Sequence, residues 1–173
     1  MKKVLMVGLT FIIIFLTILL QMCFLNCIPL AGVIANAGIV LVTGLGLVTG
    51  SFIGGITGCV YGIIIDVSFG RNIGLYTALY TLVGFVSGYL NKSFSKGNKI
   101  SMIMLMLICT SIFEVLTYLF NILFNGFDLN IKVLITKLVF ESIYNTILTI
   151  LFFKPIMFYG DLLNKTKNSY YLL

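Results

Sequence analysis

The chain has 173 residues, of which 60% are hydrophobic and 9% are charged. Soluble domains carry roughly 25% charged residues, so this composition excludes a soluble domain and is typical of a helical membrane protein. The net charge of +6 does not indicate a nucleic-acid partner, because the basic residues stand in short clusters between apolar runs. The absence of histidine from the sequence excludes imidazole acid–base catalysis and imidazole metal ligation.

The first half of the chain predicts several membrane crossings. Residues 4–65 contain no charged side chain, and this run is far too long for a single helix across a bilayer. Because the apolar runs are continuous, they favour helices over a transmembrane barrel. We predict an all-α integral membrane protein, a six-transmembrane-helix bundle that forms a single domain over residues 1–173. In chain order, the predicted helices cover residues 4–25, 30–48, 50–67, 74–90, 100–124 and 131–153.

The two ends of the chain are predicted as a retained first helix and a cytoplasmic tail. The apolar run after Lys3 exceeds the apolar region of a signal peptide, and no Ala-x-Ala cleavage site follows it. Lys154 and Pro155 are expected to end helix six, which leaves residues 154–173 at the membrane interface. The four cysteines are expected to be small buried hydrophobes rather than metal ligands; they are Cys23, Cys27, Cys59 and Cys109.

Charge distribution predicts the orientation of the bundle. Six spans place both termini on one side of the membrane, and most basic residues fall on that side: Lys2, Lys3, Lys92, Lys96, Lys99, Lys154, Lys165 and Lys167. Only Arg71 and Lys132 fall in loops on the other side, and Lys137 lies inside helix six. Because basic loops stay in the cytoplasm, both termini are predicted to be cytoplasmic.

Glycines recur every four residues in and before the third predicted helix. Gly46 is followed by Gly50, Gly54, Gly58 and Gly62, and helix four carries a shorter strip of Gly84 and Gly88. In lipid, glycine lets two helix backbones approach closely, so we expect helix three to be a central helix held by its neighbours. The strip serves internal packing, or part of it docks a helix of a partner protein.

Helices five and six each carry a polar stripe at helical spacing. The first consists of Thr110, Glu114, Tyr118, Asn121 and Asn125, and the second of Lys137, Glu141, Asn145 and Thr149. The two helices run antiparallel, and the stripes reach similar depths. Since an ionisable residue inside a membrane is costly when unpaired, we expect Lys137 to pair with Glu141 or Glu114.

Three interpretations of this intramembrane polar cluster stay open. Its predicted members are Glu114, Tyr118, Asn121, Lys137, Glu141 and Asn145. They form a polar clasp between two helices, a site for a small molecule or ion, or a contact to a partner helix. With no histidine, nucleophile or metal site beside the carboxylates, we expect no enzyme, no metal and no cofactor.

The outer loop between helices three and four carries the most specific pattern in the chain. Asp66 is followed by Gly70, Arg71 and Gly74. Asp66 can neutralise or orient Arg71, and both glycines suit turns with positive φ. This stretch resembles the bacterial rod-shape-determining membrane protein family MreD. In that family a glycine-rich helix is followed by an aspartate, by glycines four and eight residues later, and by a second helix that ends near a glycine, as does Gly84-Phe-Val-Ser-Gly88-Tyr89 here. The sequence motifs that carry this resemblance cover residues 54–90, whereas the similar order of helices and loops covers nearly the whole chain.

One element departs from the family pattern. The family often has a Pro-Asn pair near the start of helix two, whereas here Pro29 and Asn36 are separated. The resemblance implies a non-catalytic scaffold or regulator of the cell-elongation machinery that builds lateral peptidoglycan, in the bacterial inner membrane. The partners it implies are an MreC-like membrane protein, the actin-like MreB, the RodA glycosyltransferase and a class B penicillin-binding transpeptidase.

The resemblance also implies a fold similar to the substrate-binding S-component of energy-coupling-factor vitamin transporters. Such an S-component is therefore the alternative function for this chain. That family usually carries an Ala-x-x-x-Ala strip on helix one, where the energising module docks. The first alanine of this chain is Ala31, which counts against the alternative.

Overall fold

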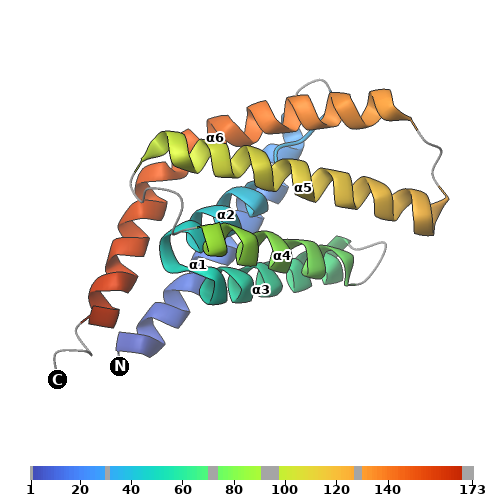
Figure 1. Cartoon of the computed structure of the whole chain (residues 1–173). Coiled ribbons are helices and arrows are strands. Elements are labelled where there is room, and N and C mark those ends of the chain that lie inside the picture. The colour runs from blue at the N-terminus through green and yellow to red at the C-terminus, as the bar shows by residue number, and fades with distance from the viewer. Residues whose placement is uncertain (1, 30–31, 70–73, 91–97, 127–129, 169–173) are drawn as a thin grey trace.

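The computed structural model describes residues 2–29, 32–69, 74–90, 98–126 and 130–168. Within these ranges the chain forms α1 (Lys2–Cys23), η1 (Leu25–Cys27), α2 (Ala37–Thr49), α3 (Ser51–Phe69), α4 (Leu75–Tyr89), α5 (Lys99–Asn125) and α6 (Ile131–Asn168). The predicted all-α six-helix bundle is confirmed. Among the described residues, four stretches are long and apolar enough to cross a membrane, namely Gly8–Cys27, Ser51–Ser68, Lys99–Asn125 and Ile131–Leu162. Figure 1 shows both ends of the chain at the same end of the bundle.

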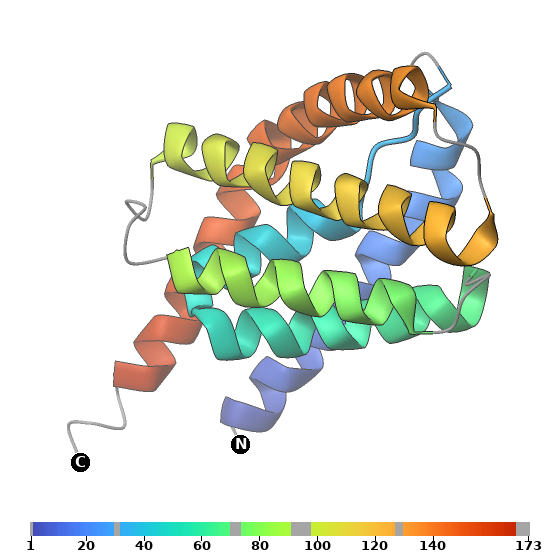
Figure 2. The ribbon, with the colours of Figure 1, turned by 45° about the vertical axis from the view of Figure 1, so that its right-hand side comes forward.

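The helix at the centre of the bundle is α2. It contacts α1, α3, α4, α5 and α6 (Figure 2), and every residue from Ala37 to Val48 is buried. Its side chains are apolar or small on all sides, which suits a helix that is surrounded by protein. The prediction that helix three is central was therefore wrong. α3 instead leaves large side chains such as Phe52, Ile56 and Val67 exposed on its outer face.

α2 is shorter than predicted, because it begins at Ala37 rather than at residue 30. Its 13 residues span about 20 Å at 1.5 Å per residue, less than the roughly 30 Å hydrocarbon core of a bilayer. The Asn36 side chain caps the helix by accepting a hydrogen bond from the Ile39 N–H at 3.2 Å. Residues 32–36 are non-helical and lead the chain into the bundle; we name them the entry segment.

α6 is longer than predicted, because it continues through Pro155 to Asn168. Proline lacks the N–H of a regular helical hydrogen bond and typically kinks a helix. α6 indeed changes direction between its orange and red portions (Figure 1). The continuation is held by packing: Ile156 and Tyr159 are buried, and the Tyr159 hydroxyl bonds to the Thr10 hydroxyl. The described part of the predicted tail, residues 154–168, is thus a continuation of α6, and Ile156 and Tyr159 pack it against α2 and α1.

The glycine strips of α3 and α4 face each other. A Cβ added at Gly62 would lie 2.5 Å from the Thr77 Cα, and one at Gly58 would overlap the Tyr80 carbonyl. Gly54, Gly84 and Gly88 likewise approach backbone atoms of the opposite helix or its first residue. The two helices therefore pack backbone against backbone, which requires glycine at these positions. These contacts lie within the chain.

Gly50 differs from these glycines: its backbone lies against Gly88, but its own missing side chain is not what permits the contact. It ends α2 with φ +100°, a left-handed conformation that favours glycine, and a Cβ there would meet no atom within 4 Å. Gly50 thus forms the turn between α2 and α3, whereas the other glycines of the repeat lie at helix–helix contacts. Gly46 provides the close contact in α2, since a Cβ there would lie 2.8 Å from the Gly84 carbonyl oxygen.

A pair of alanine substitutions on α3 tests this packing. Gly58→Ala should lower the free energy of unfolding by about 1–3 kcal/mol, because the new methyl group meets the α4 backbone, which cannot rotate away. Gly55→Ala is the matched control: its methyl group would find its nearest neighbours at 4.0 Å, and alanine favours the helix. Unfolding by dodecyl sulfate titration, followed by circular dichroism, measures both. Equal effects would show that α3 and α4 are not in backbone contact.

Candidate functional site

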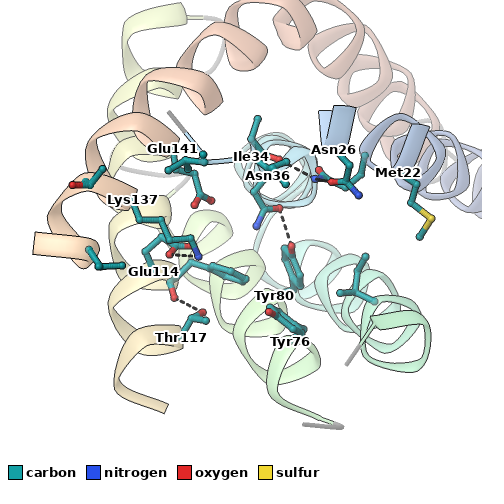
Figure 3. A pocket seen from close by; sticks show the side chains of 18 of the residues that line it. Met22, Asn26, Ile34, Asn36, Tyr76, Tyr80, Glu114, Thr117, Lys137 and Glu141 are labelled. Atoms are coloured by element: carbon teal, nitrogen blue, oxygen red, sulfur yellow. Dashed lines mark hydrogen bonds and ion pairs between the residues drawn. The ribbon is translucent and has the colours of Figure 1, made fainter. Parts of the chain in front are cut away.

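A cavity of about 710 Å³ lies between α5 and α6 on one side and α3, α4 and the entry segment on the other. Its lining combines charged groups, amides and aromatic rings, as Figure 3 shows. Charged groups come from α5 and α6, aromatic rings from α3, α4 and α5, and amides from α1, η1 and the entry segment. Three chain segments that are far apart in sequence therefore build one polar site inside an otherwise apolar bundle.

Lys137 pairs with Glu114 across the α5–α6 interface. The Lys137 Nζ lies 2.7 Å from the Glu114 Oε2, so Glu114 is the partner among the two predicted alternatives. The Glu114 side chain is 3% exposed, whereas that of Lys137 is 46% exposed and lines the cavity. The buried carboxylate thus keeps a counter-charge while the ammonium group stays accessible, which lowers the cost of burying the pair.

Glu141 lies one turn beyond Lys137 on α6 and is 2% exposed. Its carboxyl group lies against the side chains of Glu114 and Asn145. Figure 3 shows Glu114, Lys137 and Glu141 gathered on the same side of the cavity, opposite Tyr76 and Tyr80. Two carboxyl groups therefore share the neighbourhood of one ammonium group.

Tyr118 and Asn121 are not part of this cluster, although their spacing placed them on the Glu114 stripe. The Tyr118 hydroxyl accepts a hydrogen bond from the Asn130 N–H at 2.7 Å, just before α6 begins. The Asn121 amide donates to the Thr117 carbonyl of its own helix at 2.9 Å. Both side chains form hydrogen bonds near the C-terminal end of α5, and Thr117, which the stripe did not include, lines the cavity instead.

Asn145 connects α6 to the entry segment. Its Oδ1 accepts a hydrogen bond from the Asn36 N–H at 2.8 Å, and its Nδ2 donates to the Thr110 hydroxyl at 3.2 Å. Asn145 is completely buried. Its main role in the fold is therefore to satisfy a backbone group that lipid could not satisfy.

Gln21 and Asn36 complete the hold on the entry segment, and sequence reasoning missed this role. Gln21 donates to the Ala35 carbonyl and accepts from the Ala37 N–H, both at 2.9 Å. Asn36 accepts from the Tyr80 hydroxyl at 2.8 Å. The available signal was the presence of three carboxamide side chains, Gln21, Asn26 and Asn36, within the uncharged stretch before Asp66.

The outer-loop motif acts as a helix cap. Asp66 at the end of α3 accepts hydrogen bonds from the Tyr76 N–H at 3.1 Å and the Thr77 N–H at 2.8 Å, and also from the Thr77 hydroxyl. Gly74 precedes α4 with φ +98°, as expected for a turn glycine. A carboxylate at a helix N-terminus satisfies free N–H groups and complements the helix dipole. Gly70 and Arg71 lie outside the described residues, and so does the expected contact between Asp66 and Arg71.

Replacing Gln21 by the similarly shaped methionine tests the hold on the entry segment. Gln21→Met removes both hydrogen bonds and leaves a buried carbonyl and a buried N–H unpaired, so the free energy of unfolding should fall by about 2–4 kcal/mol. Ser111→Ala is the control, because that exposed hydroxyl bonds only to its own helix at the Leu107 carbonyl. Dodecyl sulfate titration measures both variants, and an unchanged midpoint for Gln21→Met would contradict the described bonding.

Comparison with known proteins places these features in a family. No curated protein and no solved structure matches the chain, so its expected likeness to a transporter S-component stays a prediction. A family model described as rod shape-determining protein MreD matches residues 2–162, which include all the features of the cavity and of the glycine contact. The chain therefore belongs to the rod shape-determining protein MreD family.

Proposed function

We propose that this protein is a non-catalytic scaffold or regulator of the complex that builds lateral cell-wall peptidoglycan during cell elongation. The observation that carries this proposal is the family match over residues 2–162, because the family's role is the determination of rod shape. Two observations support a non-catalytic role: the sequence has no histidine, and the buried Glu114 of α5 is engaged in an ion pair with Lys137 of α6.

The proposed location is the bacterial inner membrane, with both termini in the cytoplasm. Two observations support it. Both ends of the chain lie at the same end of the bundle (Figure 1), and most basic residues outside the spans belong to that side by sequence. The entry segment and the cavity then lie toward the outer face, because α1 runs from the cytoplasmic end to Cys23.

The proposed direct partner is an MreC-like membrane protein, and MreB, RodA and a class B penicillin-binding transpeptidase belong to the same complex. The surface available to such partners is the apolar exterior of the helices. The glycines Gly54, Gly58, Gly62, Gly84 and Gly88 are occupied by the α3–α4 contact, so a partner helix has to use another face.

Photo-crosslinking tests the partners and finds the docking face. A benzophenone analogue of phenylalanine replaces one exposed phenylalanine at a time on five helices: Phe15, Phe52, Phe85, Phe124 and Phe158. Illumination of living cells should give protein adducts from at least one of these faces, and mass spectrometry should identify the MreC-like protein in them. Buried Phe113 is the matched control and should give no such adduct. If all five exposed positions yield no elongation protein, the proposed scaffold role fails.

Reporter fusions test the orientation separately. A fluorescent protein fused after Leu173 should fluoresce, as expected in the cytoplasm, and alkaline phosphatase inserted at residues 127–129 should be active, as expected outside it. Activity of alkaline phosphatase at the C-terminus would contradict the proposed topology.

A further inference from the structure

Two carboxyl groups lie together in the interior between α5 and α6. Glu114 and Glu141 are each 2% exposed. The Glu141 carboxyl group makes hydrogen-bonding contact with the side chains of Glu114 and Asn145. An ionised carboxylate only accepts hydrogen bonds, so two ionised carboxylates cannot bond to each other. A hydrogen-bonding contact between two carboxyl groups therefore requires a proton on one of them.

The basic groups of the cavity do not remove this requirement. The Lys137 Nζ lies 2.7 Å from the Glu114 Oε2, and within the described part of the chain no other pair of opposite charges approaches within 4 Å. Lys132 also lines the cavity, but it lies on the exposed first turn of α6. One ammonium group thus balances one carboxylate, and a second negative charge beside it is costly in a buried site. A proton on Glu141 makes the three contacting side chains neutral as a set.

The other titratable groups around the cavity bring no competing charge to Glu141. α3 and α4 face it with phenol groups, which are uncharged at neutral pH. Asp66 at the end of α3 bonds instead to the N–H groups that begin α4. The titratable residues that line the cavity with Glu141 are Tyr61, Tyr76, Tyr80, Glu114, Lys132 and Lys137.

The contacts of Glu141 extend to the entry segment. Asn145, which contacts the Glu141 carboxyl group, also accepts a hydrogen bond from the Asn36 N–H at 2.8 Å. Lys137, at the other end of this series of contacts, is 46% exposed and lines the cavity. Polar contacts therefore run without a break from an accessible ammonium group, through both carboxyl groups, to the backbone that precedes α2.

We propose that Glu114 and Glu141 share one proton, which Glu141 holds at neutral pH, and that the contact between α5 and α6 is therefore sensitive to pH. Loss of this proton places two carboxylates side by side, and their repulsion weakens the contact. The proton exchanges with water through the cavity beside Lys137. This proposal does not depend on the scaffold role or the partners proposed above, because it rests on the chain alone.

Carbon-13 NMR of labelled glutamate is the first test. Glu114 and Glu141 are the only glutamates in the sequence, so the full chain labelled at the glutamate carboxyl carbon gives two side-chain signals. In lipid bilayers at neutral pH, one signal should have the chemical shift of a carboxylic acid and the other that of a carboxylate. Two signals of the same protonation state, whether both ionised or both protonated, would overturn the proposal.

Two substitutions then test whether the proton is shared. Glu141→Gln should remove the carboxylic-acid signal and leave the carboxylate signal of Glu114. Glu114→Gln should also remove the acid signal, because Glu141 is then the only carboxyl group beside Lys137 and ionises. An acid signal that persists in Glu114→Gln would show that burial alone protonates Glu141, and would overturn the sharing. Should either variant not fold, the signals of the unmodified chain still decide.

The pH dependence of unfolding is the second test. Glutamate in the unfolded chain is ionised above roughly pH 5, so unfolding releases the proposed proton, and stability falls as pH rises. Between about pH 6 and pH 8, the folding equilibrium constant of the unmodified chain, divided by that of Glu141→Gln, should fall by up to about tenfold per pH unit. The sequence has no histidine, the residue that usually titrates in this range.

Asp161→Asn is the matched control for this measurement, since Asp161 is exposed and does not line the cavity. It should keep the pH dependence of the unmodified chain. Dodecyl sulfate titration followed by circular dichroism measures all three proteins. The same pH dependence in the unmodified chain and in Glu141→Gln would overturn the proposal.

Discussion

The fold depends on the need to satisfy polar backbone groups inside a membrane. A lipid environment offers no hydrogen-bond partners, so a non-helical segment at membrane depth is stable only when protein groups bond to it. The entry segment meets this condition through Gln21 from α1 and Asn145 from α6, which together engage the backbone of Ala35, Asn36 and Ala37. Because the side chains come from the first and last helices, one set of hydrogen bonds ties both ends of the bundle to its centre.

The central position of α2 follows from this arrangement. The entry segment brings the chain into the bundle, and a helix of 13 residues is then surrounded by the other five. Such a helix needs small residues where neighbours approach, and Gly38, Gly44 and Gly46 meet Tyr61, Ile156 and the α4 backbone respectively. The α3–α4 pair packs against α2 through contacts at glycines. The cavity lies beside the entry segment, where a longer α2 would otherwise fill the space.

The apolar runs and glycine spacing were enough to predict six helices, because long uncharged stretches have few alternatives in a membrane. The start of α2 could not be predicted this way. Residues 32–34 are as apolar as a helix requires, but the segment that they begin is held by distant side chains: the Asn36 N–H donates to the Asn145 side chain, 109 positions away. Pro155 was misjudged for a related reason, since the burial of Ile156 and Tyr159 against distant helices outweighs its local preference.

The candidate site was predictable only in part. An unpaired charge in a membrane is costly enough that Lys137 had to meet a carboxylate, and the choice between Glu114 and Glu141 required coordinates. Helical spacing alone placed Tyr118 and Asn121 with them, but their hydrogen bonds to Asn130 and Thr117 direct both side chains to the end of α5. The cluster of aromatic rings that lines the cavity, from Tyr61 of α3, Tyr76 and Tyr80 of α4 and Phe113 of α5, depends on contacts between helices that no local pattern encodes.

Solid-state NMR of the isotopically labelled protein in lipid bilayers can detect the non-helical entry segment and its bond to α6. We expect non-helical backbone chemical shifts at residues 34–36, helical shifts from Ala37 onward, and a through-space cross-peak between the Asn36 amide and the Asn145 side chain. Helical shifts throughout residues 32–36, together with no such cross-peak, would show that Asn145 does not hold this segment.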